Sequence, residues 1–316
     1  MARCVAALVG EVVADIRPAG SGANSHAFRV TTPSRTIAVK HYLQRAHDSR
    51  DRLGVEWRAL TFLRSAGFTN VPLPIACDDS ARLLLTDWID GVPVTKHGPQ
   101  DLDLAVDFMR QVFASSARPE AASLPLASEA CLSVPSIIRQ IERRLASLAS
   151  DPAIDRFVSR SLGPRLAVVQ RRMAAEIGDD VDLPLSLRRL IPADFGFHNA
   201  LRAPDGRLHF VDFDYFGWDD PVKLAADVIL HPAMTLTRGE KLRVIEGLAA
   251  ALPHDTEFSN RLARHRSLYA LRWALIVLNP FRHDRAPDLP TDVAARKTLL
   301  KSRLRLAQSL CEQVGI

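Results

Sequence analysis

The chain has 316 residues, of which 47% are hydrophobic and 24% are charged. This is the composition of a globular protein that is long enough for two lobes with sizeable cores. No apolar run approaches the roughly 18 residues of a membrane helix, and the N-terminus lacks a signal-peptide pattern, so we expect a cytoplasmic protein with no membrane partner. The four cysteines are far apart and form no C-x-x-C pair, which indicates free thiols rather than disulfides or a zinc site.

The net charge of +5 is concentrated near the C-terminus. Residues 257–310 carry eleven Lys and Arg against four Asp and Glu. Such a segment is either a set of solvated helix faces or a basic wall beside a phosphate or an anionic substrate. The chain has no basic tail, no aromatic-basic ladder and no zinc-finger spacing, so no nucleic-acid partner is expected. The sequence makes no prediction of the oligomeric state.

The first 90 residues alternate short apolar runs with turn signals. Runs rich in β-branched and aliphatic residues predict five strands. These lie at residues 9–16, 27–30, 36–42, 73–76 and 82–89. Between the third and fourth strands, apolar residues recur every three to four positions over residues 51–66, which predicts a helix.

Long helical periodicities follow Gly91. They predict helices at residues 100–116, 136–149, 156–177, 219–230, 238–251, 257–278 and 289–313. A hairpin of residues 200–202 and 208–211 interrupts them around a Pro-Asp-Gly turn. The predicted class is therefore α+β, with a small β-rich lobe at residues 1–90 and a larger, mainly helical lobe at residues 91–316.

The segment Asp194-Phe195-Gly196-Phe197-His198-Asn199 places an Asp and an Asn five residues apart in a predicted loop, and Asp212 follows the strand predicted at 208–211. Phosphoryl transfer from ATP needs a carboxylate that orients the acceptor hydroxyl and oxygen ligands that hold Mg²⁺. Each of the three residues alone could be an ordinary surface residue. Their joint spacing indicates Asp194 as catalytic base and Asn199 and Asp212 as metal ligands.

Lys40 is the candidate for holding the ATP phosphates. It lies in the strand predicted at 36–42, where a Lys usually extends toward water. Glu56 follows in the next helix, and kinase-like folds use such a Lys–Glu pair to fix the Lys on the phosphates. The alternative is that Glu56 is an exposed helix carboxylate.

The small-residue segment Gly20-Ser21-Gly22-Ala23-Asn24-Ser25 lies between the first two predicted strands. Small residues let backbone N–H groups approach phosphates, which makes Ser21 a candidate for nucleotide binding. An ordinary hairpin turn explains the segment equally well. The chain has no G-x-x-x-x-G-K-[ST] motif, so a P-loop fold is disfavoured.

Together these residues resemble the aminoglycoside phosphotransferase and choline/ethanolamine kinase-like family of small-molecule kinases. The similarity extends from Gly20 to about Leu278 and is strongest at residues 190–221, where Asp194 to Asn199 resembles the catalytic loop and the segment around Asp212 resembles the metal motif. It implies a bilobal, protein-kinase-like fold, with a nucleotide-binding lobe at 1–90 and a catalytic and substrate lobe at 91–316. It also implies ATP and Mg²⁺ as cofactors. The adenine would bond to the backbone at Asp87, Trp88 and Ile89.

The chain departs from this family at two places that bear on the site. Pro192-Ala193 stands where the family usually has His-Gly before the catalytic Asp. Leu224 stands where the family often has an Asp in a helix, twelve residues after the metal Asp, and Asp227 follows one helical turn later. Asp227 could take over that structural role.

The helix over residues 267–276 resembles the family helix that borders the acceptor site, which makes Tyr269, Arg272 and Trp273 candidate substrate contacts, together with Asp214 from the metal motif. A cationic amine needs aromatic faces or carboxylates around it, whereas this helix offers Arg272. We therefore infer a neutral or anionic hydroxylated acceptor, such as a sugar or a sugar derivative. The alternative is that these side chains of the helix are partly core.

The sequence thus predicts an ATP- and Mg²⁺-dependent kinase that transfers the γ-phosphate to a hydroxyl of a small molecule, whether a sugar, an amino alcohol or an aminoglycoside-like compound. The alternative is a nucleotide-binding pseudokinase with a regulatory or scaffolding role, which the Pro192-Ala193 departure motivates. A protein kinase is disfavoured because no A-P-E segment and no recognisable activation loop follow Asp212.

Overall fold

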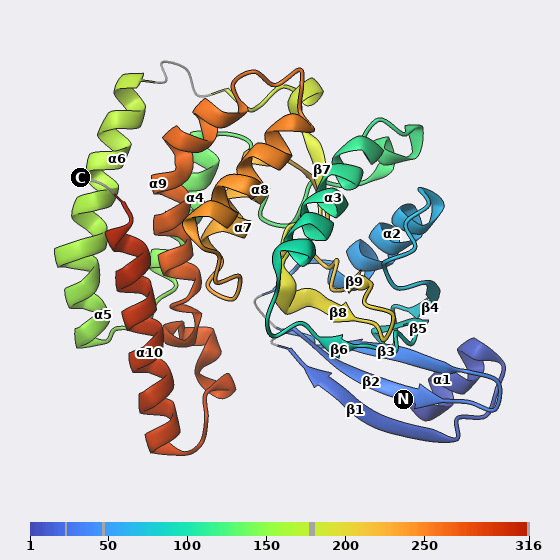
Figure 1. Cartoon of the computed structure of the whole chain (residues 1–316). Coiled ribbons are helices and arrows are strands. Elements are labelled where there is room, and N and C mark those ends of the chain that lie inside the picture. The colour runs from blue at the N-terminus through green and yellow to red at the C-terminus, as the bar shows by residue number, and fades with distance from the viewer. Residues whose placement is uncertain (23, 46–47, 177–180, 315–316) are drawn as a thin grey trace. The chain divides into compact units, whose positions relative to one another are not determined.

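The computed structural model describes residues 1–22, 24–45, 48–176 and 181–314 (Figure 1). Its contacts divide the chain into two compact units. Met1–Ser128 and Arg189–Trp218 form the first, here called the sheet unit, and Glu129–Arg188 and Asp219–Ile316 form the second, here called the helical unit. The units do not divide at residue 90, and the lobe boundary there stays a prediction.

The sheet unit is built on a five-stranded antiparallel sheet of order β1-β2-β3-β5-β4. The strands are β1 (Asp15–Ser21), β2 (Ser25–Thr31), β3 (Thr36–Tyr42), β4 (Pro74–Asp78) and β5 (Leu83–Asp87). Helix α2 (Arg52–Ser65) joins β3 to β4, as the apolar spacing predicted. In the register of the central strands, Lys40 lies opposite Ala27 on one side and Leu84 on the other.

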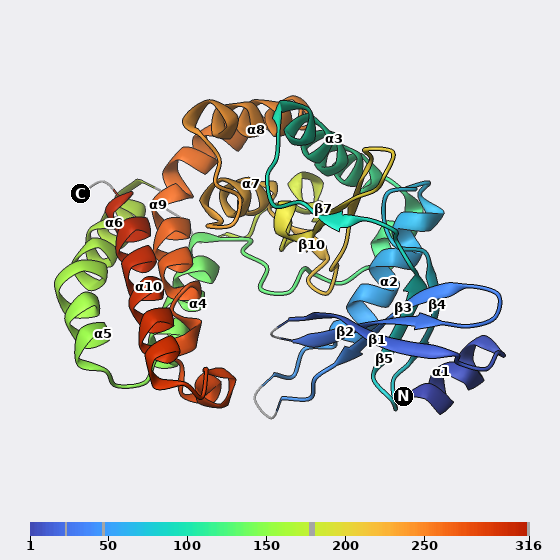
Figure 2. The same ribbon diagram turned by 60° about the horizontal axis from the view of Figure 1, so that its bottom comes forward.

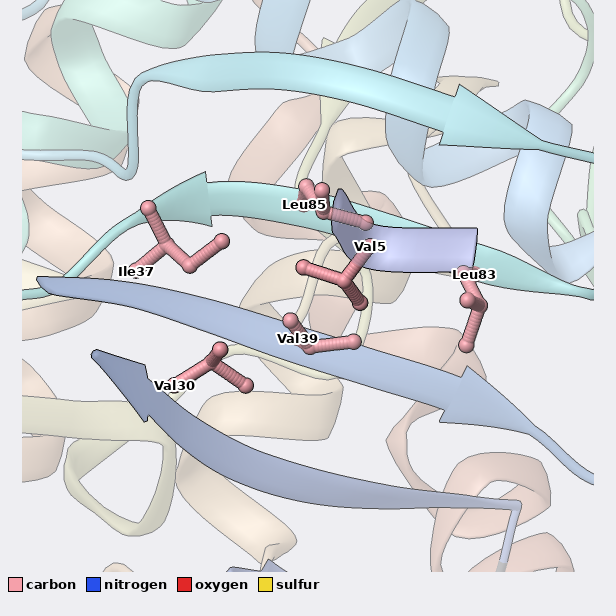
Figure 3. Close-up of a cluster of buried hydrophobic side chains, with 6 residues drawn as sticks. All are labelled: Val5, Val30, Ile37, Val39, Leu83 and Leu85. Atoms are coloured by element: carbon pink, nitrogen blue, oxygen red, sulfur yellow. The ribbon is translucent and has the colours of Figure 1, made fainter. Parts of the chain in front are cut away.

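Helix α1 (Ala2–Val9) occupies a segment that partly overlaps the strand predicted at residues 9–16, and that prediction was wrong except at its last two residues. The helix ends at Gly10, which takes the left-handed conformation (φ 72°) that glycine adopts without strain. In Figure 3, Val5 of α1 packs into a buried cluster with side chains of β2, β3 and β5, and we attribute the helical conformation to this packing. The cluster consists of Val5, Val30, Ile37, Val39, Leu83 and Leu85.

Strand alternation then fixes the direction of Lys40. Successive side chains of a strand point to opposite faces of the sheet. Ile37 and Val39 enter the cluster on the α1 face, so Lys40 and Tyr42 project from the other face, where α2 presents Glu56. The alternation of apolar residues in β3 therefore places the Lys40 side chain on the face of the sheet that meets α2.

The rest of the sheet unit carries the loops of the predicted site. Strand β6 precedes helix α3 (Pro99–Ser115), and the other short strands follow it; they form a three-stranded sheet, β6-β8-β9, and a two-stranded sheet, β10-β7. The hairpin predicted from the Pro-Asp-Gly turn is the antiparallel pair β8 and β9. The bounds of these strands are β6 (Val92–Pro93), β7 (Arg189–Ile191), β8 (Ala200–Arg202), β9 (Leu208–Phe210) and β10 (Gly217–Asp219).

The helical unit is organised around α9 (Phe258–Ile276), which packs against α4, α7 and α10 (Figures 1 and 2). Its helices confirm the helical periodicities read from this part of the sequence, except for the single helix predicted over residues 156–177. They are α4 (Val134–Ala146), α5 (Pro152–Phe157), α6 (Gly163–Glu176), α7 (Pro221–Leu230), α8 (Arg238–Ala250), α9 and α10 (Val293–Glu312). No helix within the described ranges is long and apolar enough to cross a membrane.

The single helix predicted over residues 156–177 is instead α5 and α6, which are joined by a π-helical segment at Val158–Leu162. Pro164 explains this segment, since proline has no N–H to donate and its ring clashes with the preceding turn of the helix. Residue 177, at the end of that prediction, lies outside the described residues.

Candidate active site

The two aspartates of the predicted site project from loops that share one aromatic core. Each aspartate is followed by a buried phenylalanine, Phe195 after Asp194 and Phe213 after Asp212. Phe195 stacks on Phe108 of α3 with ring centroids 5.4 Å apart, and Phe213 lies 6.2 Å from the same ring. The alternation of a polar residue and a buried ring thus anchors both carboxylates to one point of the sheet unit.

The backbone beside each aspartate is also constrained. Asp212 has φ 70° and Ala193, which precedes Asp194, has φ 62°. This left-handed conformation costs a residue with a side chain about 1–2 kcal/mol, although Asp tolerates it better than most. Ala193 stands where the resembled family has glycine, so the loop keeps a left-handed turn without the residue that adopts it most easily.

Asn199 connects the two loops. Its side-chain amide nitrogen donates to the backbone carbonyl oxygen of Asp194 at 2.9 Å. Its backbone carbonyl oxygen accepts from the N–H of Val211, also at 2.9 Å. The first bond turns the amide oxygen Oδ1 away from the Asp194 carbonyl. The second places Asn199 beside the residue that precedes Asp212. The structure therefore brings Asp194, Asn199 and Asp212 into one neighbourhood, and their roles as base and metal ligands stay predictions.

Lys40 bridges the sheet and the Asp212 loop. Its Nζ lies 2.6 Å from Oε2 of Glu56 and 2.5 Å from Oδ1 of Asp212. Burial alone would lower the pKa of Lys40, but the carboxylates of Asp212 and Glu56 outweigh it and raise the pKa, so the ammonium stays charged. Glu56 is buried and also accepts bonds from the Tyr42 hydroxyl and from the N–H of Phe213 (3.3 Å). The reading of Glu56 as an exposed carboxylate is thereby excluded.

Asp214 takes part in a buried ion pair. Its Oδ2 accepts from Nη1 of Arg52 at 2.6 Å, and the Arg52 guanidinium lies over the Tyr215 ring, 4.7 Å from its centroid. Burial, with the nearby charge of Asp212, raises the pKa of Asp214 to about 7, while Lys40 and Arg52 oppose that shift. Only 4% of Asp214 is exposed, so the predicted contact with a substrate stays a prediction that this burial disfavours.

The residues predicted to meet the adenine follow β5. Asp87 is the last residue of the strand, and its carboxylate accepts from the N–H of Leu73 at 2.6 Å. Trp88 lies under the guanidinium of Arg29, 5.4 Å from the ring centroid. Ile89 continues the chain without regular structure. Their role in adenine binding stays a prediction.

The predicted small-residue turn is shorter in the structure. Residues up to Ser21 belong to β1 and Ser25 begins β2, so the connection is limited to residues 22–24. Ala23 of this segment lies outside the described residues. Ser21 pairs with His26 across the two strands, and its role in nucleotide binding stays a prediction.

The three candidate substrate residues of α9 lie inside the helical unit. Tyr269 has no exposed surface, and Arg272 and Trp273 are buried. Arg272 and Trp273 both donate to Oδ1 of Asp227, at 3.1 and 2.8 Å. Asp227 thus organises this interior, and its substitution for the aspartate of the resembled family stays a prediction. Substrate contact by the three residues stays a prediction, and their burial favours the alternative of core packing.

Two parts of the site were not predicted from the sequence. His198 places Nε2 3.3 Å from Oδ1 of Asp194, and the signal for it is its position within the same loop, four residues after the aspartate. Arg52 holds Asp214 from 162 residues away in the chain, and no local pattern marks it.

An antiparallel sheet whose lysine pairs with a helix glutamate and with an aspartate of a following loop is the arrangement of protein-kinase-like phosphotransferases. The sequence matches the model of the phosphotransferase enzyme family over residues 15–259, and the chain belongs to this family. No curated protein sequence matches it.

Solved structures with similar folds are distant in sequence. Choline kinase LicA from Streptococcus pneumoniae has a TM-score of 0.66 at 16% identity, with 99% of each chain covered. Spectinomycin phosphotransferase APH(9)-Ia, solved with ADP and spectinomycin, has a TM-score of 0.62 at 12% identity and 98% coverage of each chain. A thermostable mutant of aminoglycoside phosphotransferase APH(4)-Ia, solved with ADP and hygromycin B, has a TM-score of 0.60 at 14% identity, covering 99% of this chain and 97% of that one. These likenesses confirm the kinase-like α+β fold.

Proposed function

We propose that the protein is a kinase that transfers the γ-phosphate of ATP to a hydroxyl group of a small molecule. The observation that carries the proposal is the contact of the Lys40 ammonium with both Glu56 and Asp212. Phosphoryl transfer needs a cation fixed on the nucleotide phosphates beside an acid that holds a metal, and this pairing supplies both. Solved structures with similar folds include ones obtained with ADP, AMP or AMP-PNP, which supports nucleotide use.

The donor set of the site suits Mg²⁺. Asp212 offers a carboxylate and Asn199 an amide oxygen, and hard divalent cations prefer oxygen ligands. When bound, Mg²⁺ would neutralise charge on the phosphates during transfer. Lys40 then holds the phosphates from the sheet side, in a position that Glu56 fixes through its bonds to Lys40, Tyr42 and Phe213.

Asp194 is the proposed base. Its side chain is 43% exposed, and Asn199 and Phe195 fix its backbone, so the carboxylate can meet a hydroxyl from solvent in a constant orientation. It accepts a hydrogen bond from the acceptor hydroxyl, aligns the oxygen with the γ-phosphorus and takes the proton as the new P–O bond forms and the bond from the γ-phosphorus to the bridging oxygen of ADP breaks. The acceptor we propose is a neutral or anionic hydroxylated molecule such as a sugar derivative.

A variant at Asp194 tests this assignment. Asp194→Ala should bind AMP-PNP with Mg²⁺ as the wild type does but lower turnover by about 10²–10⁴-fold, the range for a lost general base. Calorimetry measures the binding, and ADP release with sugars, amino alcohols and aminoglycosides measures the turnover. Asp205→Ala is the matched control, because Asp205 pairs with exposed Arg207 in the β8–β9 turn. Near-wild-type turnover by Asp194→Ala would refute its role.

The nucleotide-binding pseudokinase remains the second candidate because of one observation, the left-handed Ala193 in place of the family's glycine. The same screen separates the two functions. A pseudokinase binds AMP-PNP and releases no ADP with any acceptor, whereas a kinase releases ADP faster with at least one of them.

A further inference from the structure

A cavity of about 390 Å³ lies in the helical unit between α8 and α9. This volume falls within the roughly 300–1,000 Å³ typical of small-molecule sites. Its wall is mainly aliphatic, formed by Ile229 from the end of α7, Leu242 and Ile245 of α8, and Leu262 of α9. Ile229 and Leu262 are almost fully buried, whereas Leu242 is 49% exposed. The cavity therefore has an apolar interior and an apolar residue at its mouth.

Three cations also line the cavity: Arg238 and Lys241 of α8 and Arg266 of α9. Within the described ranges, none of the three has a hydrogen-bonding or ion-pairing side chain as partner. Other cations of the same unit differ, since Arg261 pairs with Asp220 and Asp255 and Arg272 pairs with Asp227.

The electrostatics of Lys241 follow from this arrangement. Burial lowers its pKa, and the charge of Arg266 lowers it further. No carboxylate among the described residues offsets either effect there, so the mouth of the cavity carries a positive potential that a bound anion would neutralise.

We propose that this cavity binds a small anionic amphiphile, a molecule with an apolar body and a terminal carboxylate or phosphate. The aliphatic wall receives the body, and the three cations receive the terminal anion. An entirely apolar ligand would leave the cations unneutralised, and inorganic phosphate would leave the aliphatic wall in contact with water.

Calorimetry with monomeric sodium decanoate tests the proposal on the full chain. The wild type should bind one decanoate saturably, and Lys241→Met/Arg266→Ala should weaken binding by at least about tenfold because two cations no longer meet the carboxylate. Decyl phosphate should bind as decanoate does, and the neutral 1-decanol should bind more weakly than either. Arg303→Ala, an exposed arginine of α10 with no ion pair in the described part of the chain, should bind like the wild type.

A second variant separates the cavity from its charges. Ala263 lines the cavity from α9 and is exposed, so Ala263→Trp fills the space without removing a cation or a core side chain. It should abolish decanoate binding while thermal unfolding stays close to wild type. No saturable binding by the wild type, or unchanged binding by both variants, would overturn the proposal. Binding to phosphatidylglycerol vesicles without binding of monomeric decanoate would also overturn it, in favour of a membrane-surface contact.

Discussion

Replacing Glu56 with Gln perturbs the most connected residue of the proposed site. Its carboxylate accepts from Lys40, from the Tyr42 hydroxyl and from the Phe213 N–H. Gln keeps one oxygen acceptor, which can still serve Phe213, but it turns an NH₂ group toward the Lys40 ammonium. Lys40 then depends on Asp212 alone.

The magnitude follows from these contacts. Removing one partner of a buried ion pair costs about 3–5 kcal/mol, and one charge-assisted hydrogen bond is worth about 1.5–3 kcal/mol. Lys40 keeps a second carboxylate and is 18% exposed along its side chain, so we expect the free energy of unfolding to fall by about 2–4 kcal/mol, below the full cost of an orphaned charge. We also expect ATP affinity to fall by roughly tenfold or more, because the ammonium is no longer fixed from the helix side.

Urea unfolding measures the first effect, and calorimetric titration with AMP-PNP measures the second. Glu142→Gln is the matched control, since Glu142 lies exposed on α4 with no ion pair in the described ranges. An unfolding free energy and a nucleotide affinity for Glu56→Gln that both equal those of Glu142→Gln would refute the proposed function of the Lys40–Glu56 pair.

Asp227→Asn should lower the free energy of unfolding by about 3–5 kcal/mol, measured in urea, because buried Lys223 and Arg272 both pair with this carboxylate; a loss below about 1 kcal/mol would contradict the structural role. Arg52→Met should cost a similar amount, about 3–5 kcal/mol by the same assay, since it leaves the buried Asp214 carboxylate without its closest cation. Burial and two neighbouring arginines lower the pKa of His265 to about 4, below its unfolded value near 6.5. Stability should therefore be complete above pH 6.5 and decrease by about 3 kcal/mol as the pH falls to 4, and His265→Gln should remove this part of the pH dependence; equal slopes for both proteins would contradict it.

The spacing of apolar residues along the chain predicted the elements that bury one apolar face. Strand β3 has the predicted bounds because its alternation separates an apolar face from the face of Lys40. Asp194, Asn199 and Asp212 also lie in one short stretch of chain, and a buried phenylalanine follows each aspartate, so their proximity could be read from the sequence while their roles stay predictions.

The spacing of residues along the chain was not enough where packing between distant segments determines the conformation or the partner of a residue. The short apolar run at the N-terminus fits a helix or a strand equally, and the contact of Val5 with the sheet selects the helix. No local pattern marked the bonds that hold Arg272 and Trp273 to buried Asp227, 45 and 46 residues earlier in the chain. The partner of Asp214 is 162 residues away, so only the folded chain shows it.

The position of α1 limits how far the chain can be truncated for expression. The family match begins at residue 15 and ends at residue 259, one residue after α9 begins. A fragment trimmed to that match would lose Val5, which closes the sheet core in Figure 3, and nearly all of α9, the central helix of the other unit. Both cores would then expose aliphatic surface, and we expect such a fragment to aggregate. The segment that matches the family is therefore shorter than the segment that each unit needs in order to fold.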